Sequence, residues 1–217
     1  MPLDACTHCQ NYDISFRPRS GYPVSEAQLA YIISDLYTSG ARNINWVGGE
    51  PTPNLYTILG ALILSDISIA QIWNSNFYHS KEVMSLLLDV IDLWLPDFKY
   101  GSDECAKRLS NVDNYLSVVT RNIKDAYLNT VEGLSSIIIR HLVLPNHYEC
   151  CSKPILEWIA SETPKAPVNI MAQYRPYYLA LTDKRYSDVS RAVYREEVNK
   201  VRKLADELGV EWRSVTY

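Results

Sequence analysis

Apolar positions along the chain repeat with two spacings, one typical of helices and one typical of buried strands. After Ser25, apolar residues recur every three or four positions from Leu29 to Leu36, and Gly40 follows. This spacing places the apolar side chains on one face of a helix that begins near Ser25 and ends before Gly40. The next segment, Asn43 to Val47, is a short run of the kind that forms a buried strand.

The same alternation of strand and helix continues to the end of the chain. Further strands are predicted at Ile69 to Trp73, Leu93 to Pro96, Ile137 to Leu144 and Val168 to Ala172, with a last short one at Val210 to Val215. Further helical regions are predicted at Ser80 to Ile91, Ser102 to Tyr127, Lys153 to Ser161 and Ser190 to Leu208. Strands separated by helices imply long crossovers and a parallel sheet, so the fold class is α/β. Periodicity alone leaves open whether the sheet is doubly wound or a partial barrel.

Composition limits what such a chain does. Its 217 residues, 47% of them apolar, suffice for one well-filled core, so we expect a single domain over residues 1–217. The net charge of -4 provides no basic field for nucleic acid or anionic lipid. The apolar stretches are too short to cross a bilayer, and no basic region followed by an apolar run marks a secretory signal. We therefore expect a cytoplasmic protein that binds neither nucleic acid nor membrane.

Polar residues gather after four of the predicted strands. They are Gly48 to Thr52, then Asn74, Ser75 and Asn76, then Asp97 and Lys99, and finally Gln173, Tyr174 and Arg175. Parallel α/β folds build their sites at the carboxyl ends of strands, so these clusters predict one shared site. Alternation along the chain places Asp97 and Lys99 on one side, where they form an ion pair or hold a zwitterionic ligand. Because Glu50 and Asp97 lie in loops, we expect both to serve ligand binding more than folding.

Five cysteines without an export signal predict reduced thiols. Cys6 and Cys9 are two residues apart, a spacing that aims two sulfurs at one metal or cluster. Cys150 and Cys151 could join them in a four-sulfur zinc site, although adjacent cysteines chelate one ion poorly and free cysteines are often buried as small apolar residues.

Several of these segments resemble a known enzyme superfamily. They are Cys6-Thr-His-Cys-Gln-Asn-Tyr-Asp-Ile-Ser15, Gly48-Gly-Glu-Pro-Thr52, Asp97-Phe-Lys-Tyr-Gly-Ser-Asp-Glu-Cys-Ala106 and Arg140-His-Leu-Val-Leu-Pro145. Together they resemble the radical S-adenosylmethionine (radical SAM) enzymes, in the branch related to pyruvate formate-lyase-activating enzymes. The resemblance implies a curved partial (β/α) barrel, similar to part of a TIM barrel.

The resemblance also implies a cofactor and a reaction. In the family, three thiolates hold a [4Fe-4S] cluster whose fourth iron binds S-adenosylmethionine, and reductive cleavage yields a 5'-deoxyadenosyl radical that abstracts hydrogen. Cys6 and Cys9 match the second and third cluster ligands. The matching candidates for S-adenosylmethionine binding are Gly48, Gly49, Glu50, Asn74, Asn76, Asp97, Lys99 and His141. Implied partners are an electron donor and either a protein substrate, such as a glycyl-radical enzyme, or a small molecule.

One position departs from the family pattern. Pro2, which cannot ligate iron, stands where the first cluster cysteine belongs, and Met1 to Ala5 are too few to form the first barrel strand. We therefore expect an N-terminally truncated member of the family. The third ligand is either lost or replaced, with Cys105, Cys150, Cys151 and His8 as the candidate replacements. The alternatives are a cluster-free binding or scaffold protein of the same fold and a zinc-stabilised α/β domain, so whether the chain is an enzyme stays open.

Overall fold

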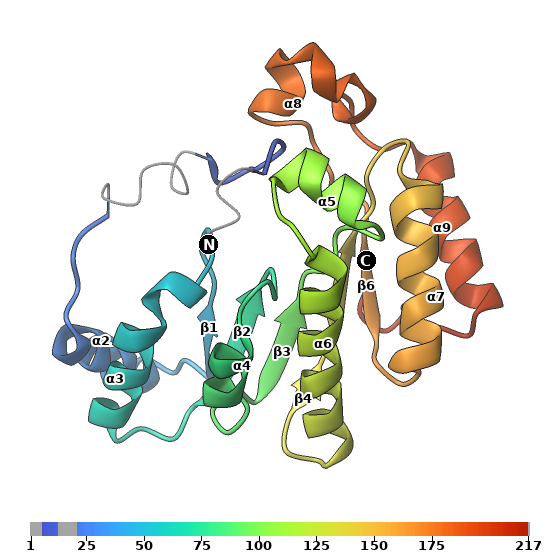
Figure 1. Cartoon of the computed structure of the whole chain (residues 1–217). Helices are drawn as coiled ribbons and strands as arrows, with labels where there is room; N and C mark the ends of the chain where they lie inside the picture. Colours follow the sequence, from blue (N-terminus) through green and yellow to red (C-terminus); the bar gives the residue numbers. More distant parts are fainter. Residues whose placement is uncertain (1–5, 13–20, 217) are drawn as a thin grey trace.

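Parallel strands alternate with helices in the computed structural model, which describes residues 6–12 and 21–216 (Figure 1). The strands are β1 (Asn43–Trp46), β2 (Ala70–Ser75), β3 (Leu93–Pro96), β4 (Ser136–Ile137), β5 (Ile139–Leu142) and β6 (Val168–Met171). The α-helices are α2 (Glu26–Thr38), α3 (Leu55–Ser65), α4 (Lys81–Leu87), α5 (Asp103–Ser110), α6 (Tyr115–Val131), α7 (Lys153–Glu162), α8 (Leu179–Thr182) and α9 (Arg195–Glu207). Short turns of other helix types are η1 (Thr52–Asn54), η2 (Tyr148–Ser152) and η3 (Lys184–Val189).

The strands form one curved parallel array. Strands β1, β2, β3 and β4 pair in that order, and β5 pairs with β6, all in parallel. Strand β5 follows β4 directly, and the amide of Phe98 donates to the carbonyl of Arg140 at 2.8 Å, so β5 continues beside the end of β3. The predicted α/β class with a parallel sheet is confirmed.

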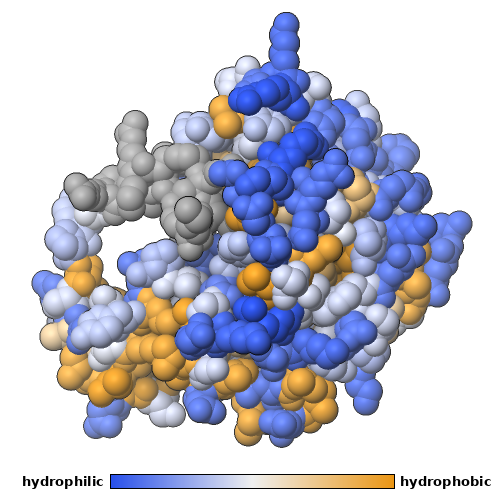
Figure 2. Space-filling model, viewed as in Figure 1, coloured by the Kyte–Doolittle hydropathy of each residue, from blue (hydrophilic) through white to orange (hydrophobic). Residues whose placement is uncertain are grey.

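The core lies between the sheet and the helices that flank it. Trp73 of β2 and Trp94 of β3 are both fully buried at its centre. Helix α5, helix α8 and residues 6–12 instead lie beyond the ends toward which the strands run (Figure 1). Apolar side chains gather on the outer surface of α2 and α3 (Figure 2), where Ile63 is 84% exposed. Among the described residues, none of the helices combines the length and apolar character needed to cross a membrane.

The structure corrects some predicted boundaries. The region predicted as helical from Ser102 to Tyr127 is two helices, because Asn111 and Asn114 adopt left-handed backbone angles that interrupt it. Helix α3 was not predicted, although an apolar stretch marks its position.

The C-terminal boundaries also differ from the prediction. Helix α9 begins at Arg195, five residues after the predicted start at Ser190. The segment Val210 to Val215 is not a strand, although the carbonyl of Glu211 accepts one hydrogen bond from the amide of Val168 in β6 at 2.8 Å.

Candidate functional site

A cavity of about 240 Å³ lies at the carboxyl ends of the strands. Nearly all residues predicted for the site line it, namely Cys6, Cys9, Gly48, Gly49, Glu50, Asn74, Asn76, Asp97 and Lys99. They come from the cysteine loop (residues 6–12), from the last residues of β2 and from the segments that follow β1, β2 and β3. The cavity also includes Arg140 of β5 and Gln173 after β6. The polar residues at the strand ends thus converge on one cavity, and their role in binding stays a prediction.

Main-chain hydrogen bonds hold the cysteine loop between two helices. The amide of Thr7 donates to the carbonyl of Leu109 in α5 at 2.9 Å. The carbonyl of Thr7 accepts from the amide of Ala180 in α8, also at 2.9 Å. Cys6 and Cys9, one on each side of Thr7, are thereby presented to the cavity by a fixed backbone.

The surroundings of Cys6 favour its thiolate form. Burial alone would raise the pKa of Cys6, but the electrostatic effects of His8 and then Lys99 lower it to about 6. A thiolate is the form in which cysteine ligates metals. His8 also lines the cavity and is 4% exposed, yet neither of its ring nitrogens meets hydrogen-bond geometry with another described residue.

Glu50 joins the loop after β1 to the loop after β2. Its Oε1 accepts hydrogen bonds from the hydroxyls of Thr52 at 2.6 Å and Ser75 at 2.8 Å, and its Oε2 accepts from the amide of Asn76 at 3.0 Å. The preceding Gly48 has φ of 132°, a backbone conformation that side chains disfavour. Glu50 therefore contributes hydrogen bonds to the fold as well as a carboxylate to the cavity wall, and the expectation that it serves binding more than folding stays a prediction.

Asp97 lies between two basic side chains. Its Oδ2 is 2.9 Å from Nζ of Lys99, and its Oδ1 is 3.4 Å from Nε of Arg140. Burial alone would lower the pKa of Lys99, but Asp97 and then Cys6 raise it, so Lys99 is a cation. Arg140 also donates to the side-chain oxygen of Asn74. The predicted ion pair of Asp97 and Lys99 is thus part of a larger charged group on the cavity wall.

Asp97 retains an unused acceptor. Its Oδ1 is buried and makes no hydrogen bond to the described residues, despite its proximity to Arg140. Such a buried oxygen is costly unless a ligand or water supplies a donor. Arg140 was not predicted as a site residue, because it lies inside a strand. Side chains alternate along a strand, so a core position at His141 would have indicated that Arg140 faces the other way, toward the cavity.

His141 does not line the cavity, contrary to the prediction. It is fully buried, and its ring nitrogens lie 2.9 Å from the carbonyl of Phe98 and 2.8 Å from the hydroxyl of Ser152. Burial lowers the pKa of His141 to about 4, so it is neutral near pH 7. In β5 it points to the core while its neighbour Arg140 points to the cavity, as strand alternation requires.

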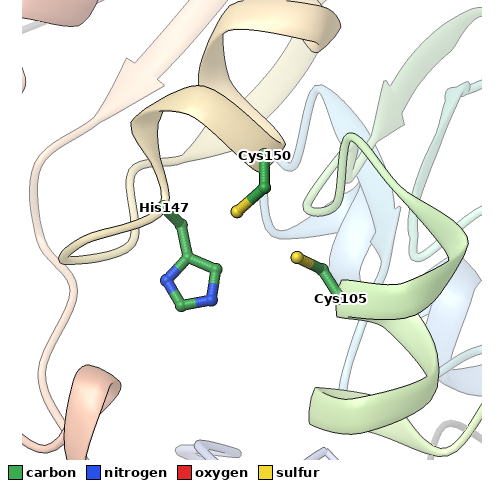
Figure 3. Close-up of side chains that lie close together, drawn as sticks. All are labelled: Cys105, His147 and Cys150. Carbon is green, nitrogen blue, oxygen red and sulfur yellow. The ribbon is translucent and has the colours of Figure 1, made fainter.

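A second cluster of sulfur and nitrogen ligands lies outside this cavity. The ligand atoms of Cys105, His147 and Cys150 all lie within 4.8 Å of one another (Figure 3). Hydrogen bonding by Cys151 outweighs the effect of burial and lowers the pKa of Cys105 to about 3, whereas burial raises the pKa of Cys150 to about 11.

The cysteines of the described residues thus fall into two groups that lie apart. Cys105, Cys150 and Cys151 do not line the cavity that contains Cys6 and Cys9, so the structure does not unite the two groups into one four-sulfur site. Within the described residues, the cavity offers two thiols. Pro2, at the position of the absent third ligand, lies outside the described residues.

Comparisons with known proteins support the fold. No family model matches the chain. The uncharacterized protein MJ0674 of Methanocaldococcus jannaschii is 40% identical over an alignment that covers 95% of this chain and 60% of that relative. The chain thus spans less than two thirds of the curated relative that it matches.

A solved structure shares this architecture. The crystal structure of a domain of pyruvate-formate lyase-activating enzyme from Bacteroides vulgatus matches with a TM-score of 0.58 and 17% identity, over 82% of this chain and 99% of that chain. At this level of identity the match concerns the fold, and it agrees with the partial parallel (β/α) barrel that the sequence predicted. The chain is therefore an α/β protein with the fold of an activating-enzyme domain.

Proposed function

We propose that the chain is a radical SAM protein whose cavity binds S-adenosylmethionine beside an iron–sulfur site at Cys6 and Cys9. The observation that carries this proposal is the meeting of both cysteines with Glu50, Asp97 and Lys99 in one cavity at the strand ends. The activating-enzyme fold is consistent with it. The reaction class would be hydrogen-atom abstraction from a protein partner or a small molecule, with a glycyl-radical enzyme as one such partner.

The charged wall of the cavity suits the aminoacyl end of S-adenosylmethionine. That end carries an ammonium group and a carboxylate, and the cavity offers carboxylates at Glu50 and Asp97 beside cations at Lys99 and Arg140. The buried Oδ1 of Asp97, which makes no hydrogen bond to the described residues, is an acceptor for the ammonium group. Opposite charges fixed in one cavity favour a zwitterion over a simple anion or cation.

The donor set for the cluster is incomplete among the described residues. Cys6 and Cys9 supply two thiolates, and the sequence has Pro2 where the family pattern has a third. When bound, a [4Fe-4S] cluster would supply the electron that cleaves S-adenosylmethionine. Two thiolates do not complete the site that the resemblance implies, so the residues fit the cosubstrate better than they fit the cluster.

Calorimetric titration with S-adenosylmethionine tests the binding proposal without requiring a cluster. Asp97→Asn removes one charge from the cavity wall, and we expect it to weaken binding at least tenfold, as the loss of a hydrogen bond to a charged group does. Asp113→Asn is the matched control, because Asp113 is exposed and pairs only with Lys107 among the described cations. Equal affinity of the Asp97→Asn variant and the unmodified chain would refute the assignment of this cavity.

The presence of only two thiols in the described cavity favours a second candidate function, a cluster-free binding or scaffold protein of the same fold. Such a protein would bind S-adenosylmethionine or a similar zwitterion and would not cleave it. Iron and sulfide analysis after anaerobic reconstitution, together with the visible absorbance of the product, distinguishes the two functions. Iron and sulfide in equal amounts support the radical SAM proposal, and their absence supports the binding protein.

A further inference from the structure

Cys105, His147 and Cys150 come together from two elements that are distant in the sequence. Cys105 lies in α5, whereas His147 immediately precedes the π-helical turn η2, which contains Cys150 (Figure 3). Cys105 and His147 are buried and Cys150 is partly exposed. Their ligand atoms all lie within 4.8 Å of one another. Ligand atoms on a tetrahedral zinc ion are about 3.4 to 3.8 Å apart, so small side-chain rotations would complete the geometry.

Hydrogen bonding fixes the tautomer of His147. Its Nδ1 lies 2.8 Å from the carbonyl oxygen of Pro145. A carbonyl only accepts hydrogen bonds, so Nδ1 carries a proton, and Nε2 presents a lone pair in the neutral ring; Nε2 also lies 3.4 Å from Oδ2 of Asp188. Zinc-binding histidines are commonly oriented in this way, with one ring nitrogen on the metal and the other donating to a carbonyl or carboxylate.

The charges around the cluster balance with a divalent cation. Arg108 contacts Nε2 of His147 at 3.0 Å and donates to both carboxylate oxygens of Asp188, one of them at 3.1 Å. With a metal bound, Cys105 and Cys150 would both be thiolates, so together with Asp188 they would carry three negative charges, and Arg108 carries one positive charge. A divalent ion would make the sum zero. A metal ion can bind Nε2 only if Arg108 moves away from that nitrogen. The hydrogen bonds from Arg108 to Asp188 would then hold the guanidinium beside the site.

Backbone geometry holds the two elements close together. In η2, the amides of Cys151 and Ser152 both donate to the carbonyl of His147, at 2.9 and 3.2 Å, and this widened turn exposes Cys150 toward α5. Gly101, just before α5, packs so closely that an added Cβ would lie 2.6 Å from the carbonyl oxygen of Cys151. Widened helical turns of this type often occur at functional sites. Simple packing of small apolar thiols would not explain a partly exposed Cys150 aligned with a histidine of fixed tautomer.

We propose that Cys105, His147 and Cys150 form a zinc site, with two thiolates and Nε2 of His147 as protein ligands and a water in the fourth position. Thiolate and imidazole ligands together are typical of zinc, which accepts a set of two cysteines and one histidine. The site is separate from the cavity and does not depend on the proposed function. Its structural effect would be to tie Cys105 of α5 to His147, 42 residues later in the sequence and just before η2.

Zinc binding is tested in the full chain carrying Cys6→Ser and Cys9→Ser, so that the cavity thiols contribute nothing. Competition with a chromophoric chelator should show about one tightly bound zinc per chain. In the same background, Cys150→Ser should weaken zinc binding at least tenfold. Cys151→Ser is the comparison variant, because it removes the neighbouring thiol but keeps a hydroxyl that can donate to Cys105 in its place. Equal zinc affinity with and without Cys150→Ser, or a larger loss with Cys151→Ser, would overturn the assignment.

A second measurement does not depend on whether the Cys150→Ser and Cys151→Ser variants fold. Cobalt added to the Cys6→Ser, Cys9→Ser chain should produce a thiolate-to-cobalt charge-transfer band in the near ultraviolet. Zinc should protect the partly exposed Cys150 from alkylation, as read by peptide mass spectrometry. Absence of both the cobalt band and the protection would reject the site, as would a disulfide between the two cysteines that persists under reducing conditions in the presence of zinc.

Discussion

Glu50 illustrates how a single carboxylate at a strand end serves two purposes. It accepts hydrogen bonds from Thr52, Ser75 and the amide of Asn76, and it lines the cavity. Removal of a carboxylate leaves these donors unpaired unless water replaces it. Both ligand affinity and the stability of the folded chain are therefore expected to respond to substitution at this residue.

We predict that Glu50→Ala lowers the free energy of unfolding by about 1 to 3 kcal/mol, as expected when partly buried donors lose a charged acceptor. Urea denaturation of the unliganded chain measures this change. Glu207→Ala is the control, because Glu207 is an exposed residue of α9 and its loss should change stability by less than about 0.5 kcal/mol. A Glu50→Ala chain as stable as the control would show that the hydrogen bonds of Glu50 do not support the fold.

Buried histidines predict a loss of stability in mild acid. Burial lowers the pKa values of His79 and His141 from 6.5 to about 4. Between these values the unfolded chain binds protons that the folded chain does not, so each residue makes stability fall as the pH drops from about 6.5 toward 4. At pH 5 the loss is about 2 kcal/mol for each histidine.

The pH effect is measured as a difference between variants, because other groups also titrate in this range. His79→Gln removes one of the two histidines, so the loss of stability between pH 7 and pH 5 should be smaller in this variant by about 2 kcal/mol. Urea denaturation at the two pH values gives the comparison. The same loss in variant and parent would show that His79 is protonated equally easily in the folded and unfolded chains.

Pro2 supplies a test of the cluster site at the level of one residue. Its ring nitrogen is part of the backbone and offers no ligand, so we predict that the unmodified chain holds a labile or substoichiometric cluster. Pro2→Cys should raise the iron and sulfide content after anaerobic reconstitution and should permit formation of 5'-deoxyadenosine. Pro2→Ser is the control for the substitution itself. Equal iron content and equal cleavage in the unmodified and Pro2→Cys chains would mean that another residue is the third ligand.

At the scale of elements, the approach of α5 to η2 depends on the absence of a side chain at Gly101. A Cβ there would lie 2.6 Å from the carbonyl oxygen of Cys151 and 2.8 Å from that of Cys150. We predict that Gly101→Ala lowers the free energy of unfolding by about 1 to 3 kcal/mol, because backbone atoms must move apart. It should also weaken zinc binding, because it separates Cys105 from Cys150.

Gly21→Ala is the matched control for this prediction, because an added Cβ at Gly21 has no neighbouring atom within 4 Å. Thermal denaturation measures stability, and chelator competition measures zinc affinity. If Gly101→Ala were as stable as Gly21→Ala, the packing between the two elements would be looser than the structure indicates. Loss of stability with unchanged zinc affinity would contradict the role of Gly101 in aligning the two cysteines.

The sequence predicted the elements well where local pattern determines them. Strand β3 has the predicted bounds, Leu93 to Pro96, because it is a continuous apolar run between polar segments. The break between α5 and α6 was missed because left-handed asparagines such as Asn111 resemble ordinary polar helix residues in a one-dimensional pattern. The convergence of Glu50 and Asp97 was predictable because parallel strands end on the same side of the sheet.

The remaining site features depend on packing that the sequence does not display. His141 and Arg140 are adjacent, and only the packing on the two sides of β5 decides which of them faces the cavity. Cys105 is 42 residues from His147, so no short spacing between metal ligands linked the two in the sequence. The neighbouring cysteines Cys150 and Cys151 were instead considered as partners of Cys6 and Cys9. Long-range contacts between loops were thus the main source of missed or incorrect predictions.

At the scale of the whole molecule, the cavity and the group of Cys105, His147 and Cys150 are separate sites on one continuous core. Because the cysteine loop is held by the backbone of Thr7, we predict that the Cys6→Ser, Cys9→Ser chain folds and melts within a few degrees of the parent chain. A change of about 1 kcal/mol corresponds to a shift of about 2 to 4 °C at this size. Differential scanning calorimetry provides the measurement, and a large drop in melting temperature would indicate that the thiols themselves support the loop.

The two main-chain bonds of Thr7, to Leu109 and from Ala180, have an evolutionary consequence. Every residue except proline supplies the same amide and carbonyl, so the shape of the loop places few demands on the side chains that it carries. Residues at ligand positions are therefore free to diverge without the protein being lost to misfolding. A lineage built on this frame could change its metal chemistry, or abandon it, while natural selection continued to act on an intact pocket.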